Sequence, residues 1–203
     1  SEQSGYQVSI NDNGTVLAVA STSFSYSNTG SNGWNIGIVR IYSWDGTNWN
    51  QLGNGIEGAD GEYSGVALSI NEIGDVVAIG GDNERVRIYT WDGINNWNQL
   101  GNDIDGNYMD QFGASTGSVS ISSDGSIIAI GAYGGTTDGN NLPNPIINPD
   151  GLVRVYHWNG ANWNQLGNDI NGVSSYSQFG RAVSLSSDGS IVAVGARQGG
   201  SNG

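Results

Sequence analysis

One tryptophan-rich segment occurs three times in this chain, and it constrains the fold more than any other feature. Its copies, which we call the Trp modules, cover residues 37–58, 85–106 and 151–172. The third reads GLVRVYHWNGANWNQLGNDING, and the second has one extra residue before its second Trp. Side chains in 153–158 would alternate between two faces, as in a β-strand. Asn159-Gly160 predicts a tight turn into another strand around 163–166.

A second repeated segment, the hairpin module, alternates with the Trp modules at 8–21, 68–81, 119–132 and 183–196. The third copy reads VSISSDGSIIAIGA. Two runs of β-branched residues around a polar turn ending in Gly predict a β-hairpin. The second run of each hairpin is apolar almost throughout, which predicts a strand covered on both faces.

Together the two modules predict a unit of four antiparallel strands, which we call A to D. A four-stranded repeat of about 40–50 residues or more is typical of β-propeller blades. We therefore expect an all-β chain with one propeller region at 1–203. Its units should cover about 5–62, 63–111, 112–178 and, as a half unit, 179–203.

Three and a half blades would leave edge strands open, and open edges invite association. We therefore expect the chain to belong to a larger repeat protein or to close with a second chain. Two copies would total seven blades, so a homodimer is one such closure.

The composition excludes several partners. The chain has 203 residues, 34 of them Gly, and a formal net charge of −13. Only six residues are basic, all of them Arg, and this excess of negative charge argues against a nucleic-acid partner and disfavours an anionic membrane surface. With no Cys there is no disulfide or thiolate metal site. No apolar run is long enough to cross a bilayer, and no signal peptide is evident. An acidic, Lys-free surface suits a secreted or cell-surface protein.

The chain resembles FG-GAP repeat proteins. The resemblance rests on Phe112-Gly113 and Phe179-Gly180, each followed by VSxSxDG and then AIGA or AVGA. It covers nearly the whole chain, although the pair becomes Gly5-Tyr6 in the first unit and 63–65 reads YSG in the second. The resemblance implies an integrin-like propeller used for extracellular binding or adhesion, and it does not imply catalysis.

The resemblance also raises calcium binding, because FG-GAP repeats often carry a DxDxDGxxD loop in the A–B hairpin. Here the hairpin turns read NDNG, NEIG, SSDG and SSDG. Calcium requires six or more oxygen ligands, several of them from carboxylates. We therefore expect no calcium in these hairpins and no other cofactor, although calcium is the cation the motif would favour.

The loop between strands B and C is the variable part of the repeat. It is long at 22–36 and 133–150 but short at 82–84. A constant scaffold with one variable loop is how repeat proteins usually place a recognition surface. Aromatic residues outside the repeat pattern are our candidate ligand-binding residues in these loops: Trp34, Phe24, Tyr26 and Tyr133.

Three other features have competing interpretations. The Trp pairs of the Trp modules could stack on sugars, but contact between blades is favoured because the pairs follow the strand pattern. The oxygen-rich segments at 102–107 and 168–172 could bind a cation, but turns linking blades are favoured. His157 is the only His, and it lacks partners that would make a zinc site or a catalytic triad.

The sequence thus favours an extracellular binding or adhesion module, without catalysis, for a carbohydrate or protein partner. One alternative is a purely structural repeat subunit of a surface assembly or filament. Another is a propeller hydrolase or lyase acting on polysaccharides, since two acids can meet at a propeller centre.

Overall fold

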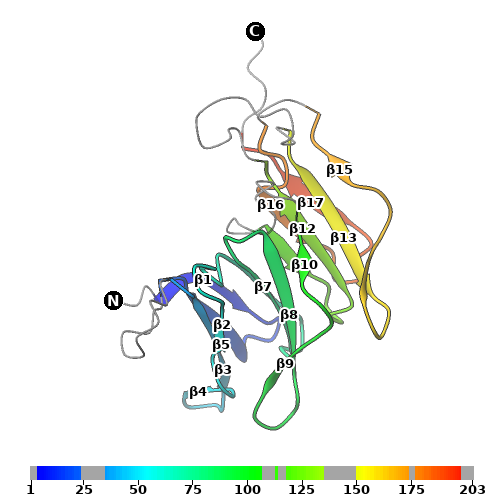
Figure 1. The fold of residues 1–203 in the computed structure, drawn as a ribbon. Helices are drawn as coiled ribbons and strands as arrows, with labels where there is room; N and C mark the ends of the chain where they lie inside the picture. The colour runs from blue at the N-terminus through cyan, green and yellow to red at the C-terminus, as the bar shows by residue number, and fades with distance from the viewer. Residues whose placement is uncertain are drawn as a thin grey trace.

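The computed structural model describes residues 4–23, 35–106, 113, 118–134, 150–173 and 177–197. These residues form 17 β-strands, arranged in four sheets (Figure 1). All strand pairs within the sheets are antiparallel. Within these described ranges, no helix is long and apolar enough to cross a membrane.

The first three sheets repeat one arrangement, and we call each a blade. Blade 1 contains β1 (Ser4–Ile10), β2 (Val16–Ser21), β3 (Ile38–Trp44), β4 (Trp49–Gln51) and β5 (Ile56–Glu57). Blade 2 contains β6 (Ala67–Ile70), β7 (Val76–Gly80), β8 (Arg85–Trp91), β9 (Trp97–Gln99) and β10 (Ile104–Asp105). Blade 3 contains β11 (Val119–Ile121), β12 (Ile127–Ala132), β13 (Leu152–Trp158), β14 (Trp163–Gln165) and β15 (Ile170–Asn171). A fourth sheet, the half blade, pairs β16 (Ala182–Leu185) with β17 (Val192–Gly195).

The expected strand order A-B-C-D is confirmed, with one difference in strand D. In blade 3, β14 pairs with the end of β13, and β15 returns to pair with its beginning. Ile170 therefore lies opposite Val153 in the sheet. The sequence interpretation had instead placed it in a connection to the next unit. Strand D is thus one long strand with an interruption after Gln165, and the same split occurs in blades 1 and 2.

The cores lie between adjacent sheets, because each strand in the middle of a blade buries both of its faces. In blade 2, Val77 and Ile79 pack with Ala18 and Val39 of blade 1. The neighbouring Ala78 faces the other way and packs with Ile128 of blade 3. A smaller cluster joins blade 3 to the half blade. This two-sided burial explains the continuous apolar runs of the hairpin modules.

The A strands are connected by one serine per blade. The Ser9 hydroxyl oxygen accepts a hydrogen bond of 3.1 Å from the backbone N–H of Ile70 in the next blade. Ser69 accepts in the same way from Ile121 at 3.2 Å, and Ser120 from Leu185 at 3.0 Å. This serine occupies the same position in every hairpin module, so the contact recurs at each boundary.

The outer parts of the blades are connected through the Trp modules. The indole Nε1 of Trp163 donates a hydrogen bond of 2.8 Å to the carbonyl oxygen of Leu100 in the preceding blade. Trp158 lies over the adjacent Gly101, where an added Cβ would lie 2.6 Å from the indole ring. We call a Leu-Gly pair in this position a Leu–Gly step. A Trp pair resting on a Leu–Gly step is the joint between blades.

The two ends of this row of sheets are open among the described residues. On blade 1, Trp44 and Trp49 are 40% and 41% exposed, and Val8 and Ile10 are also exposed. Their counterparts in blades 2 and 3 rest on the blade before. At the other end, Leu166 and Ile170 of blade 3 are exposed, although the equivalent Ile104 of blade 2 is buried.

Candidate functional site

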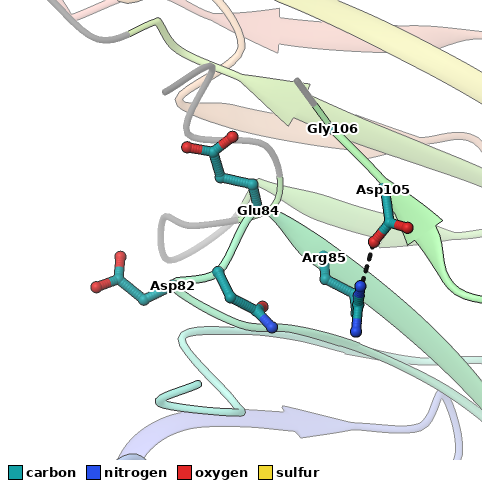
Figure 2. Close-up of a pocket in the computed structure, with 6 residues that line it drawn as sticks. Asp82, Glu84, Arg85, Asp105 and Gly106 are labelled. Carbon is teal, nitrogen blue, oxygen red and sulfur yellow. Dashed lines mark hydrogen bonds and ion pairs between the residues drawn. The ribbon is translucent and has the colours of Figure 1, made fainter. Parts of the chain in front are cut away.

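A polar recess lies beside the B–C loop of blade 2, between the ends of β7 and β8. Its volume is about 380 Å³, and Figure 2 shows the side chains around it. It is lined by the loop residues Asp82, Asn83 and Glu84, by Arg85 at the start of β8, and by Asp105 and Gly106 at the end of β10. This B–C loop is the short one of the three in the sequence.

Arg85 fixes one wall of the recess. Its Nε donates to the Asp105 carboxylate at 2.6 Å, and its Nη1 lies 3.0 Å from Asp103 (Figure 2 shows the first pair). The hydrogen bond to Asp105 raises the pKa of Arg85. Since β8 and β10 are adjacent strands, this pair bridges strands C and D at the edge of the sheet.

Arg87 anchors the same region below the surface. Its Nη1 donates to both carboxylate oxygens of Glu62, at 2.7 and 2.9 Å, and its Nε donates to Asp103 at 3.3 Å. Glu62 lies in the link from blade 1 to blade 2, and its side chain is only 3% exposed. The Glu62 carboxylate also accepts from the backbone N–H of Ala59 at 2.5 Å. Arg87, Glu62 and Asp103 therefore form a charged network whose hydrogen bonds are largely satisfied, which makes it rigid.

The remaining carboxylates give the recess its chemical character. Burial raises the pKa of Asp82, so this carboxyl holds its proton more firmly than a solvated one. Glu84 has a positive φ of 63°, which turns the chain sharply into β8. Carboxylates, an amide and a guanidinium at one opening suit a ligand with many hydroxyl or amide groups.

Tyr133 is the one candidate aromatic residue within the described ranges. It is half-buried at the B–C end of blade 3, and the Arg181 guanidinium lies 5.3 Å from its ring centroid. Burial raises the pKa of Tyr133, Arg181 opposes that shift, and the Asp82 carboxylate adds to it. The charge of Asp82, which lines the recess, therefore influences the pKa of Tyr133. The other three candidates, Trp34, Phe24 and Tyr26, lie outside the described residues.

The Trp pairs of blades 2 and 3 lie at blade boundaries, as the favoured interpretation held, whereas Trp44 and Trp49 lie on the open face of blade 1. The rings of Trp91 and Trp97 are 5.4 Å apart and tilted by 47°. Trp97 donates to Leu52 of the preceding blade at 3.0 Å. A groove of about 280 Å³ runs beside this boundary, lined by residues of strand D of blade 1 and by three residues of blade 2: Tyr89, Asn96 and Trp97. Trp97 thus contacts the preceding blade, while part of its indole ring lines the groove and remains exposed.

The oxygen-rich segments lie within the interrupted strand D, and their aspartates have a different role from either interpretation of the sequence. Asp169 accepts two hydrogen bonds of 3.0 Å from Arg154 and one of 2.7 Å from Gln165. The hydrogen bond from Arg154 contributes most to lowering the pKa of Asp169. Asp103 makes corresponding contacts, accepting one hydrogen bond of 3.3 Å from Arg87 and one of 2.6 Å from Gln99. Within the part of the chain that the structure describes, no group of three His, Asp or Glu side chains could hold a metal ion.

His157 lies on β13, exposed, opposite Ile127 of β12 and Asn164 of β14. Neither of these neighbours is an acid or a nucleophile.

The sequence interpretation missed two features of the site. The first is the recess itself, since 82–84 was noted only as the short loop. A short loop between two long ones is the signal that could have located it. The second is the Arg–Asp pair between strands C and D. Its signal is an Arg in VRxY followed 15 or 16 residues later by Asp, as in Arg154 with Asp169.

Comparisons with known proteins support the fold. No protein-family model matches the sequence, and a search of curated proteins found no match either. Among solved structures, Sqt1 from Chaetomium thermophilum is similar with a TM-score of 0.51 and 16% identity over 92% of this chain. A protein designated a 6-phosphogluconolactonase from Bacteroides fragilis is similar with a TM-score of 0.56 and 10% identity over 93% of this chain. The chain spans 39% and 46% of those two structures. Both are β-propellers, so this chain has the fold of propeller blades.

Proposed function

We propose that this chain is a binding module of a secreted or cell-surface protein. It recognises a carbohydrate or a protein through the B–C end of its blades, by equilibrium binding without turnover. The observation that carries the proposal is the recess of about 380 Å³ formed by the loop 82–84 with Arg85 and Asp105. The resemblance to FG-GAP repeats points in the same direction.

The chemistry of the recess favours a neutral ligand rich in hydroxyl or amide groups. Asp82 and Glu84 offer acceptors for hydroxyl donors, and Asn83 offers both a donor and an acceptor. Arg85 is already engaged by Asp105 and Asp103, and the chain carries a net charge of −13. A strongly anionic ligand would therefore be repelled. Tyr133 would supply apolar contact near the recess.

A glycan array probed with the purified chain tests this proposal. We expect binding to a restricted set of glycans, weakened by Asp82→Asn with Glu84→Gln and, separately, by Trp34→Ala. The control is Asp12→Asn with Glu72→Gln, which makes the same charge change on exposed A–B turns at the opposite end of the blades. Binding lost equally in the control, or turnover of a bound polysaccharide, would contradict the proposal.

A structural role in a surface assembly is a second candidate, favoured by the open face of blade 1. Val8 and Ile10 are exposed there, whereas the equivalent Leu68 and Ile70 are buried between blades. Exposed apolar faces of this kind commonly mark association surfaces. A solution mass that rises with protein concentration, and falls when Val8 and Ile10 are changed to Thr, would support this role.

A further inference from the structure

The third Leu–Gly step differs from the other two in what covers it. At Gly53 and Gly101, an added Cβ would lie 2.6 Å from a Trp ring of the next blade. At Gly167, it would meet nothing within 4 Å. The neighbouring Leu166 is 47% exposed, whereas Leu52 and Leu100 are partly buried under a Trp. Leu166-Gly167 is therefore a Leu–Gly step that no described Trp pair covers.

The half blade beside this step has an open edge. In the three full blades, strand B pairs with strand A on one side and strand C on the other. β17 is the corresponding strand, and among the described residues it pairs with β16 alone. The carbonyl of Ser126 in blade 3 accepts a hydrogen bond from the Trp158 N–H of strand C at 2.8 Å. Ser190 occupies the same position in the half blade, and the adjacent Ile191 is 67% exposed.

We propose that the β17 edge and the Leu166–Gly167 step form one docking site for a two-stranded polypeptide segment with the sequence of a Trp module. The first strand of the segment would extend the sheet beyond β17, in the mode of β-strand addition. Its Trp pair would then rest on Leu166-Gly167, and the second indole N–H would donate to the Leu166 carbonyl. The proposal is independent of ligand recognition at the B–C end.

The contacts between the blades identify this occupant. The joint occurs twice, with indole-to-carbonyl distances of 3.0 and 2.8 Å. The proposed site would repeat it at the boundary between blade 3 and the half blade. The three Trp modules of this chain are already placed in blades 1 to 3. Blade 1 of a second copy does not fit, because its Trp44 strand is already paired with β2. A second copy would bring its own strand B to the position that β17 already fills.

The test uses the full chain, labelled with ¹⁵N, and a synthetic peptide of residues 150–172. We expect saturable binding of one peptide per chain, with amide shifts at 192–195 and at Leu166-Gly167. Replacing both Trp residues of the peptide by Ala should weaken binding about tenfold or more, as expected for central aromatic anchors. A peptide that does not bind, or that binds equally well without its Trp pair, overturns the proposal.

A matched pair of variants locates the contact on the protein. Gly167→Asn places a side chain where the Trp ring would lie, and Asn tolerates the positive φ of 69°. Gly93→Asn is the control, since it too has a positive φ and open space, but on the C–D turn of blade 2. We expect about tenfold weaker peptide binding for Gly167→Asn alone. Equal affinity of the two variants would refute the assigned site.

A fused chain tests the same contact without a free peptide. A second copy of 150–172 is joined after residue 203 through a short Gly/Ser linker. We expect a higher thermal midpoint than in the unfused chain, and loss of this gain when the appended Trp pair is changed to Ala. An unchanged midpoint, or formation of dimers with no protection of β17 amides from exchange, counts against the proposal.

Discussion

The indole nitrogen of Trp97 lies 3.0 Å from the carbonyl oxygen of Leu52, and this hydrogen bond joins blade 2 to blade 1. Trp163 and Leu100 repeat the relationship at 2.8 Å between blades 3 and 2. One WNQLG sequence therefore has two roles. Its Trp contacts the blade before, and its Leu-Gly pair receives the blade after.

Removing this hydrogen bond should cost stability only where a preceding blade is present. We expect Trp97→Phe to lower the free energy of unfolding by about 1–2 kcal/mol, through the lost indole hydrogen bond and a smaller ring. Trp49→Phe is the control, because Trp49 is exposed on the open face of blade 1, and its effect should stay within about 0.5 kcal/mol. Urea denaturation of both variants measures the difference. Equal losses of stability would show that the hydrogen bond to Leu52 does not account for the effect.

The Leu–Gly steps predict a second contrast. Gly101 and Gly167 both have positive φ, at 80° and 69°, so Ala at either position costs about 1–2 kcal/mol from backbone strain. At Gly101 the added methyl would also push against the Trp158 ring. We expect Gly101→Ala to be more destabilising than Gly167→Ala by a further 1–3 kcal/mol or so. Thermal unfolding of the pair checks this, and an inverted order would contradict the packing described.

Glu62 should be far more sensitive than the exposed acids. Its side chain is 3% exposed, and neutralising it would leave Arg87 with the longer ion pair to Asp103 alone. We expect Glu62→Gln to destabilise the protein by about 3 kcal/mol, as for the loss of one partner of a buried ion pair. Asp105 is 58% exposed, so Asp105→Asn should cost about 1 kcal/mol or less. Chemical denaturation in low and high salt distinguishes the two, since salt screens only the exposed pair appreciably.

Acid should destabilise the protein through its turn aspartates. The backbone N–H of Asn96 and further hydrogen bonds lower the pKa of Asp92 to about 2. The Ser186 hydroxyl, followed by Ser190, does the same for the pKa of Asp188, also to about 2. An unfolded Asp titrates near pH 3.9 or so. Because the folded pKa values are lower, their contribution is complete above about pH 4 and is lost as the pH falls toward 2.

An NMR titration of the side-chain carboxyl carbons checks this prediction. Both residues should titrate near pH 2, and Ser186→Ala should move the Asp188 pKa upward. A midpoint near 4 for either residue in the folded protein would contradict the hydrogen-bonding described for its turn.

The sequence was informative about the scaffold because the scaffold repeats. Strand position, hairpin turns and the contact role of the Trp pairs each recur in register, so chance patterns are unlikely to imitate them. The return of Ile170-Asn171 to the sheet was missed because two residues carry too short a pattern to identify a strand. The Arg154–Asp169 pair was missed because the second half of strand D was not recognised. Without it, nothing in the sequence places Asp169 beside strand C.

The recess at 82–84 was harder to predict for a different reason. A concave surface depends on how far adjacent loops project, and no residue type at a single position encodes that. Tyr133 was identified because it departs from the repeat. Its relation to Asp82 and Arg181 could come only from the arrangement of three segments in space.

The joint between blades also bears on how such a chain can change over generations. Since each boundary uses the same Trp pair and the same Leu-Gly pair, duplication or deletion of a whole unit by recombination would recreate a matched boundary rather than an incompatible one. Each described joint is built from Trp-module residues, Trp97 with Leu52 and Trp163 with Leu100. Mutation can therefore change the B–C loop sequences while the number of units varies separately, so that loop sequence and chain length evolve as independent traits.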